Sequence, residues 1–255
     1  MNTSLSMEAD RPVALITGAS RGIGEATARE LGRRGYALAL AARSAGPLVA
    51  LAGELARAGT PALPIPTDMR SSSELRRLAE LALGHFGRVD ALIHNAGIGG
   101  AGPVARMPPN AAIVTIETNL LAPIELTRAL LPQMIERRHG AIIFVASVAG
   151  SIGLPTSAIY SASKFGMRGF ADGLRREVAQ RGIGVTVVSP GFIRTAMTAD
   201  KRFPMPGPAI VARAIASAIE RPRREVFVPG YYRLLVRAAQ LLPGLADLAL
   251  QLRGR

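Results

Sequence analysis

The chain has 255 residues, 49% of them hydrophobic and none of them cysteine, so it can bury a large core but cannot form disulfides or thiolate-bound zinc sites. Lysine and arginine number 31 against 18 acidic residues, which gives a net charge of +13, yet only 4% of residues are aromatic and no basic run alternates with them. The net charge is therefore the only feature that suggests nucleic-acid binding, and a solvated basic surface explains that charge more simply. The lack of cysteine and of a signal peptide favours a soluble, cytoplasmic protein.

Short apolar runs alternate along the chain with helix-length amphipathic segments. The first segment, 1–10, is polar, and we expect it to be flexible. The runs bounded by glycine, proline or polar residues are Val13–Thr17, Ala37–Ala41, Ala62–Ile65, Val89–Ile93, Ala141–Ala146, Val185–Val188 and Val226–Val228. Segments between them, such as Ser73–Phe86 and Pro123–Arg137, have hydrophobic residues at helical spacing. This alternation predicts one α/β domain over 11–230, with helices on both faces of a parallel sheet.

A glycine-rich turn directly follows the first apolar run. Gly18, Gly22 and Gly24 stand between that run and a helical segment that extends to Arg34. In a strand–turn–helix unit, glycines let the backbone approach a pyrophosphate, and the helix N-terminus offers N–H groups to it. A tight turn alone would also explain three glycines. Their position between the first strand and the first helix favours a dinucleotide cofactor.

The end of the second predicted strand indicates which dinucleotide. An NAD-binding domain places an acidic residue there for the ribose hydroxyl, but this chain has Arg43 and Ser44. Arg21, inside the glycine turn, adds a second cation. Two guanidinium groups can grip a 2′-phosphate, so we predict NADP(H), although two ordinary surface arginines are the competing interpretation.

A tyrosine and a lysine stand four residues apart in the second half of the chain. Tyr160 and Lys164 share one face if the segment after Pro155 is helical. The ammonium is then expected to lower the pKa of the phenol, which could exchange a proton with an alcohol or carbonyl oxygen. Ser147, at the end of a predicted strand, could hold the same oxygen by a hydrogen bond.

These motifs together resemble the short-chain dehydrogenase/reductase family, in its NADP-preferring type. The resemblance rests on residues in family order: Thr17 to Gly24, Asp68, His94 to Gly97, Asn119, Ser147, Tyr160 to Lys164, Ser189 to Gly191, and Thr195. It implies a Rossmann-like, doubly wound parallel sheet of seven strands in a single domain. It also implies an oxidoreductase that moves a hydride between a nicotinamide and a ketone or secondary alcohol.

The resemblance also implies a role for each matched residue. Tyr160 would be the general acid in reduction, Lys164 would lower its pKa and bind the nicotinamide ribose, Ser147 would orient the substrate, and Asn119 would hold a water. The implied cofactor-binding residues are Gly18, Ser20, Arg21, Gly22, Ile23, Gly24, Arg43, Ser44, Asp68, Met69, Asn95, Ala96, Gly97, Tyr160, Lys164, Pro190, Gly191, Ile193 and Thr195. Asp68 would meet the adenine amino group.

His94 departs from the family, which usually has asparagine or a similar small polar residue at this position. We interpret His94 as a hydrogen-bonded structural residue at a strand end rather than as a catalytic group. The three histidines of the chain are isolated, so no metal site is expected.

Two apolar segments, Val148–Ile159 and Phe192–Pro208, are the candidates for substrate recognition. The residues that we place in the pocket are Ile152, Leu154, Phe192, Met197 and Phe203. They favour an apolar or bulky ketone, such as a lipid, a steroid or an acyl thioester, although each could simply be core. A non-catalytic, NADP-sensing protein on the same fold is the alternative, but its usual mark, a damaged tyrosine–lysine pair, is missing.

The C-terminal segment 231–255 is expected to be an amphipathic helical extension of the same domain. One face of this predicted helix is apolar and consists of Leu234, Leu235, Ala238, Leu241, Leu242 and Leu245. Pro243 and Gly244 should divide the segment into two short helices. We expect a lid or a contact with an anionic membrane surface, against the alternative of a helix packed on the domain or in an oligomer interface.

A homodimer or homotetramer is expected from the family resemblance, in which the helices that carry Asn119 and Tyr160 commonly pack against a neighbouring subunit. The segment Pro123–Arg137 offers apolar residues of which some could face a partner: Ile124, Leu126, Leu130, Leu131 and Met134.

Overall fold

The computed structural model describes residues 11–99, 102–200 and 203–253, and the segment 1–10, expected to be flexible, lies outside these ranges. Its strands are β1 (Val13–Thr17), β2 (Ala37–Ala42), β3 (Ala62–Pro66), β4 (Ala91–His94), β5 (Gly140–Val145), β6 (Ile183–Pro190) and β7 (Glu225–Val228). They form one seven-stranded sheet in the order β3-β2-β1-β4-β5-β6-β7, and every pair is parallel. The chain reverses its direction of winding between β1 and β4, and ligands bind at such a switch point in open α/β sheets.

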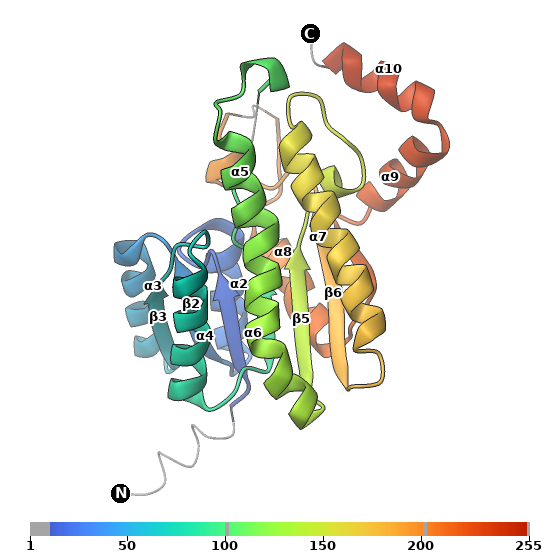
Figure 1. The fold of residues 1–255 in the computed structure, drawn as a ribbon. Coiled ribbons are helices and arrows are strands. Elements are labelled where there is room, and N and C mark those ends of the chain that lie inside the picture. The colour runs from blue at the N-terminus through green and yellow to red at the C-terminus, as the bar shows by residue number, and fades with distance from the viewer. Residues whose placement is uncertain (1–10, 100–101, 201–202, 254–255) are drawn as a thin grey trace, which may run out of the picture.

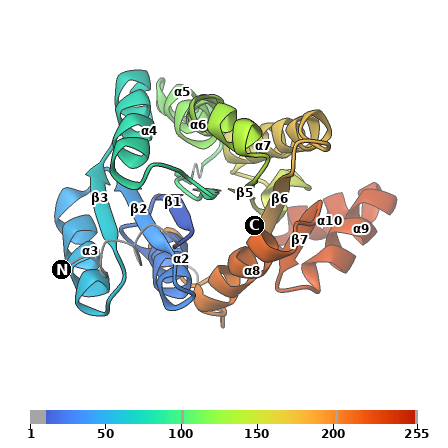
Figure 2. The ribbon, with the colours of Figure 1, turned by 90° about the horizontal axis from the view of Figure 1, so that it is seen from below.

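Helices cover both faces of the sheet (Figure 2). One face carries α4 (Ser72–Phe86), α6 (Ala122–Arg137) and α7 (Ala158–Glu177), while the other carries α2 (Gly22–Arg33), α3 (Ala45–Arg57) and α8 (Ala209–Glu220). The remaining helices are α5 (Ala111–Ile116), α9 (Tyr232–Leu241) and α10 (Pro243–Arg253). Short helical turns lie at η1 (Val104–Arg106), η2 (Glu117–Leu121), η3 (Val148–Gly150) and η4 (Ala196–Thr198). Figure 1 shows α9 and α10 beyond the carboxyl ends of the strands.

Continuous apolar strands fill the core on both sides of the sheet. Leu15 and Phe144 face the layer of α4, α6 and α7, whereas Ile16 and Leu38 face the layer of α2, α3 and α8. All four side chains are fully buried. The predicted fold class is therefore confirmed, because strands buried on both faces need no polar alternation.

Helix α6 supplies less surface to a partner than the sequence suggests. Leu126, Leu130 and Met134 are buried in the core of their own subunit. Only Ile124 and Leu131, of the residues considered, are partly exposed. Of the five residues, Ile124 and Leu131 are therefore the ones that could face a partner, because the sheet takes up the most apolar face of this helix.

None of the helices in the described ranges is long and apolar enough to cross a membrane.

Asp90 joins three elements beneath the amino ends of the strands. Its buried carboxylate accepts hydrogen bonds from the backbone N–H of Val13 (2.8 Å), from Arg88 (3.1 Å) and from Arg137 at the end of α6 (2.6 Å). Burial pushes the pKa of Asp90 up, but the Val13 hydrogen bond and the two arginines outweigh it, so the pKa lies below its ordinary value.

We predict that Asp90→Asn lowers the free energy of unfolding by about 2 kcal/mol near neutral pH, because it removes an ionised acceptor from buried donors. Since the folded-state pKa of Asp90 is lowered, its contribution is complete above the ordinary pKa of 3.8 and is lost as the pH falls towards the lowered value. The difference in free energy of unfolding between the wild type and Asp90→Asn, measured by urea unfolding, should therefore become smaller as the pH falls into the acid range. Asp172→Asn, which removes a carboxylate paired with surface arginines, is the control and should matter far less. A difference that stays constant into the acid range would contradict this.

Candidate functional site

The glycine turn after β1 leaves no room for side chains. A Cβ on Gly24 would stand 2.2 Å from the carbonyl oxygen of Gly18, and Gly18 itself has a φ of +66°. Gly22 also has a positive φ of +62°. The turn can therefore hold only glycine at these places, and it presents its backbone rather than side chains. No side chain caps the first N–H groups of α2, so these donors remain for a phosphate.

Asn95 and Thr17 hold this turn in place from behind. The Asn95 amide donates to the carbonyl oxygens of Thr17 (2.9 Å) and Gly18 (3.1 Å). The Thr17 hydroxyl accepts from the backbone N–H of Asn95 (3.1 Å) and of Ala96 (3.0 Å). Asn95 therefore supports the expected cofactor site by fixing the turn. Thr17, the last residue of β1, is a supporting residue to which the sequence analysis gave no role.

Arginines cluster at the carboxyl ends of β2 and β3. Arg21 precedes α2 and Arg43 follows β2; both are exposed, and neither forms an ion pair with another described residue. Asp68 is paired with Arg70, whose Nη2 lies 2.7 Å from Oδ2. Arg70, through its side chain and its backbone N–H, lowers the pKa of Asp68, and Arg43 adds to that effect. The carboxylate expected to meet adenine is thus already engaged by an arginine that the sequence analysis did not consider.

Asn119 fastens the loop after β4. It lies in the π-helical turn η2, and its side chain is fully buried. Its Oδ1 accepts from the N–H of Ile98 (2.8 Å), and its Nδ2 donates to the Ile98 carbonyl (2.9 Å) and to Ser163 Oγ (3.0 Å). Since these bonds use both amide hydrogens, the side chain positions the loop, and the expected water-holding role stays a prediction. Ser163, on α7, is a further supporting residue that the resemblance did not single out.

Tyr160 and Lys164 share one face of α7, as the spacing predicts. The Lys164 Nζ lies 5.8 Å from the centroid of the Tyr160 ring and donates to the carbonyl oxygen of Val145 (3.0 Å). Ser147 follows β5 and forms a hydrogen bond with Tyr160. The structure therefore brings Ser147, Tyr160 and Lys164 together.

Burial shifts the pKa values of both ionisable groups towards the neutral form. It lowers the pKa of Lys164 to about 8. It raises the pKa of Tyr160 above its ordinary value, and the hydrogen bond with Ser147 offsets only part of that rise. The expectation of a lowered pKa for the phenol is therefore wrong for the chain by itself, because burial is the largest influence on that pKa.

Gly97 links the glycine turn to these side chains. A Cβ at Gly97 would stand 3.3 Å from Asn119 Oδ1 and 3.5 Å from Lys164 Nζ. The preceding residue, Ala96, packs closely on Gly18. A Cβ on Gly18 would stand only 2.8 Å from the Cα of Ala96. The turn, the loop after β4 and Lys164 therefore form one continuous site at the switch point of the sheet.

The loop after β6 closes the other side of this site. Thr195 lies against the glycine turn, because a Cβ on Gly22 would meet its Cγ2 at 3.4 Å. Met197 lies against Gly99 in the same way, because a Cβ on Gly99 would stand 3.5 Å from the Cγ of Met197. Phe192 and Phe203 pack edge to face with 5.1 Å between their ring centroids. Three of the five expected pocket residues, Phe192, Met197 and Phe203, thus belong to this loop.

The side chains of three expected residues lie away from the open side of the site. The side chains of Met69 and Ile193 are buried in the two core clusters. Leu154 lines a cavity of about 540 Å³ together with Pro155, Phe165 and Leu250, and none of the catalytic candidates lines it. Leu154 thus lies between α7 and α10, and its role in a substrate pocket stays a prediction.

His94 is structural, as the sequence analysis expects. It ends β4 fully buried, its Nε2 lies 2.8 Å from Thr127 Oγ1, and its ring stacks on Phe144. Burial lowers the pKa of His94 to about 3, so the ring is neutral.

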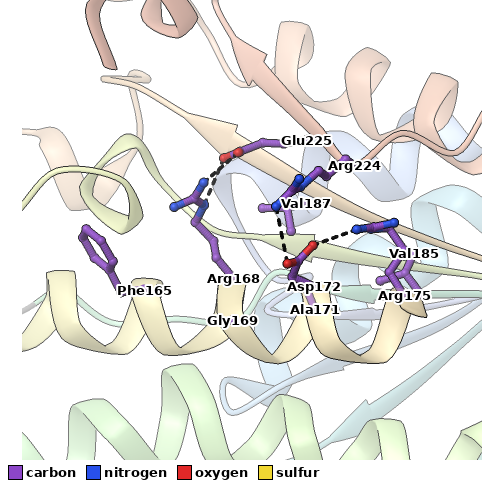
Figure 3. Close-up of a pocket in the computed structure, with 10 residues that line it drawn as sticks. All are labelled: Phe165, Arg168, Gly169, Ala171, Asp172, Arg175, Val185, Val187, Arg224 and Glu225. Carbon is purple, nitrogen blue, oxygen red and sulfur yellow. Dashed lines mark hydrogen bonds and ion pairs between the residues drawn. The ribbon is translucent and has the colours of Figure 1, made fainter. Parts of the chain in front are cut away.

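An ion pair between Arg168 and Glu225 joins α7 to β7 beside the site (Figure 3). Arg168, one turn beyond Lys164, pairs with Glu225 of β7 at 2.8 Å and donates to the carbonyl oxygen of Gly150 at 2.6 Å. Glu225 in turn accepts a hydrogen bond from Ser189 at 2.6 Å. The loop after Ser147, the helix of Tyr160 and the strand end before Gly191 are thereby held at fixed separations.

Known proteins share this arrangement. The profile of the family described as short chain dehydrogenase matches residues 12–205. The ketoacyl reductase HetN of Nostoc sp. is 37% identical over 246 residues, which cover 91% of this chain and 86% of that protein. The 3-oxoacyl-[acyl-carrier-protein] reductase FabG of Escherichia coli is 41% identical over 192 residues, 75% of this chain and 78% of FabG.

Solved structures agree with the sequence relatives. An actinorhodin polyketide ketoreductase variant with NADPH superposes with a TM-score of 0.82 at 31% identity, covering 88% of this chain and 98% of the other. A short-chain dehydrogenase/reductase from Burkholderia phymatum, in complex with NAD, gives a TM-score of 0.85 at 26% identity, covering 94% and 96%. With its fold, its motifs and these relatives, this chain belongs to the short-chain dehydrogenase family and is an oxidoreductase.

Proposed function

We propose that this protein is an NADP(H)-dependent reductase of ketones that works through Ser147, Tyr160 and Lys164. The observation that carries the proposal is that these three side chains lie together, with Lys164 beside Gly97 in the loop that packs on the glycine turn. The alternative of a sensor without activity has no comparable support, because the tyrosine–lysine pair is intact and correctly placed.

Protonation favours the direction of reduction. With the pKa of Tyr160 raised, the phenol is neutral at ordinary pH and ready to donate its proton to a carbonyl oxygen. Ser147 holds that oxygen by a second hydrogen bond, so the negative charge that develops on it meets two donors. Lys164, fixed by the Val145 carbonyl, then stabilises the phenolate that remains. A bound nicotinamide cofactor supplies the hydride.

The residues present fit NADP(H). The glycine turn and the uncapped start of α2 suit a pyrophosphate, and Arg21 and Arg43 are exposed cations without an acidic partner among the described residues. No acid follows β2 to bind a ribose 2′-hydroxyl. A guanidinium group pairs well with a 2′-phosphate, which distinguishes NADP from NAD. One neighbouring structure holds NADPH and another holds NAD, so the arginines carry this argument.

The proposed substrate is an apolar ketone, with a 3-oxoacyl thioester as the first to test. Phe192, Met197 and Phe203 line the open side of the site, and each presents an apolar surface. Relatives whose names describe ketoacyl reductases support this choice. A sugar would need more hydrogen-bonding groups than this loop provides.

We predict that Tyr160→Phe lowers kcat for ketone reduction by about 10²- to 10⁴-fold, because the proton donor is lost. The dissociation constant of NADPH should stay within about twofold of the wild-type value, since the phenol hydroxyl contributes little to cofactor binding. Single-turnover kinetics and fluorescence titration measure the two quantities. Tyr36→Phe, at a half-buried tyrosine away from the site, is the control. Near-normal turnover in Tyr160→Phe would refute the proton-transfer role.

We predict that the wild type binds NADPH more tightly than NADH and that Arg43→Asp shifts the preference towards NADH by about 10- to 100-fold. That range corresponds to the loss of one charge-assisted pair, about 1.5–3 kcal/mol. Arg57→Asp, at an exposed arginine on α3, makes the same charge change away from the expected ribose and should leave the ratio unchanged. Equal affinities of the wild type for both cofactors would remove the NADP assignment.

We also predict that the protein is a homodimer or homotetramer at micromolar concentration. Leu121 and Phe165 are large apolar side chains, 45% and 44% exposed, on adjoining elements of the α6 and α7 layer. Burying both against a second copy would stabilise an oligomer by about 25 cal/mol for each Å² removed from water. Multi-angle light scattering measures the mass, and a monomer would contradict this prediction.

A further inference from the structure

Helix α9 is attached to the domain along one face only. The ring of Tyr232 lies on Gly191, where a Cβ would come within 2.0 Å of it. One turn later Val236 is buried, and Gln240 donates to the Ser151 carbonyl at 3.3 Å. These residues recur every four positions, so they form the inner face of the helix.

The outer face of α9 is made of leucine. Leu234 is 69% exposed and Leu241 is 79% exposed, and α10 continues the surface with Leu245 at 64%. The other large apolar side chains exposed on this surface are Tyr231, Leu235, Leu242 and Leu248. Helix α9 is thus packed on the domain by its inner face alone, and the predicted division into two helices at Pro243 is confirmed.

Helix α10 faces the domain with Leu250 but not with Leu245 or Leu248. Between it and the body of the domain lies the cavity of about 540 Å³ lined by Leu154, Phe165 and Leu250. Leu245 and Leu248 remain exposed on its surface. We call α9 and α10 together the α9–α10 platform. Its apolar surface is unfavourable in water, so a binding partner that covers it would be stabilised.

The charges around the platform identify what covers it. From Tyr231 to the C-terminus the sequence holds four arginines and a single acidic residue, Asp247. Arg233 and Arg237 are both exposed on α9, on the side next to the leucines. A second copy of the chain would bring the same arginines against them, and this repulsion disfavours a symmetric contact. An anionic surface would instead attract them.

We infer that the α9–α10 platform docks on an anionic lipid bilayer, with its leucines in the headgroup region and its arginines on lipid phosphates. A helix with leucines on one side and arginines beside them has the composition of an interfacial helix. Figure 1 shows the platform beyond the carboxyl ends of the strands. The catalytic candidates lie at the same edge of the sheet, where Ser147 follows β5 and where Gly97, after β4, lies beside Lys164. Docking there brings the mouth of the site to the membrane, from which an apolar substrate can enter.

The test is a flotation assay of the full-length protein with phosphatidylcholine vesicles, with and without phosphatidylglycerol. The wild type should float with the anionic vesicles, and added salt should weaken the binding. Arg233→Gln combined with Arg237→Gln should lower the affinity about 25-fold, at about fivefold for each charge. Leu241→Asp should lower it about tenfold or more. All replaced residues are exposed, so circular dichroism should show folded variants.

Leu81→Asp, which makes the same change at an exposed leucine of α4, is the matched control and should bind vesicles like the wild type. Absence of wild-type binding, or equal binding to neutral and anionic vesicles, would overturn the inference. A Leu241→Asp variant that binds vesicles normally but loses the oligomer by light scattering would show that a second copy covers the platform. The vesicle assay needs no substrate, so its outcome is independent of the proposed activity.

Discussion

Two asparagine amides make the backbone hydrogen bonds that the sheet cannot make at its carboxyl edge. Strands stop pairing there, yet the loops that follow must pack closely, and a buried backbone group without a partner is costly. Asn95 satisfies the carbonyls of Thr17 and Gly18, and Asn119 satisfies both polar groups of Ile98. With these loops fixed, Gly97 brings the cofactor turn next to Lys164. The geometry of the site depends on this pair of amides more than on any contact between catalytic side chains.

The same burial that makes the site rigid also sets its chemistry. Removing Tyr160 and Lys164 from water shifts the pKa of each towards its neutral form, upwards for the phenol and downwards to about 8 for the ammonium. A neutral phenol can donate a proton, as the proposed reduction of a ketone requires. Oxidation of an alcohol needs the phenolate, which any positive charge brought close to the ring would favour. The protonation state of Tyr160 therefore depends on the charges that are bound near its ring.

The sequence predicted the strands, the candidate triplet of Ser147, Tyr160 and Lys164, and the glycine turn because each of these carries a local pattern. Apolar runs bounded by turn residues gave β1 to β7 within a few residues, and the spacing of Tyr160 and Lys164 gave their common face. Side chains that act over long sequence distances left no such pattern. Asp90 connects β1 to α6 by hydrogen bonds. Arg168 forms an ion pair with Glu225, and Arg70 forms one with Asp68. The pKa of Tyr160 was misjudged for the same reason, since burial is a property of the whole fold.

The contact between Tyr232 and Gly191 makes the C-terminal platform more than an appendage. Gly191 follows the last residue of β6, and the N–H of Phe192, next in the chain, donates to the Tyr232 hydroxyl at 3.4 Å. Phe192 packs on Phe203 in the loop that borders the site. A force on α9 therefore acts first on the loop that holds Thr195 and Met197 against the turn and the loop after β4. If a membrane holds the platform, the same surface that delivers an apolar substrate also holds the loop that must open to admit it.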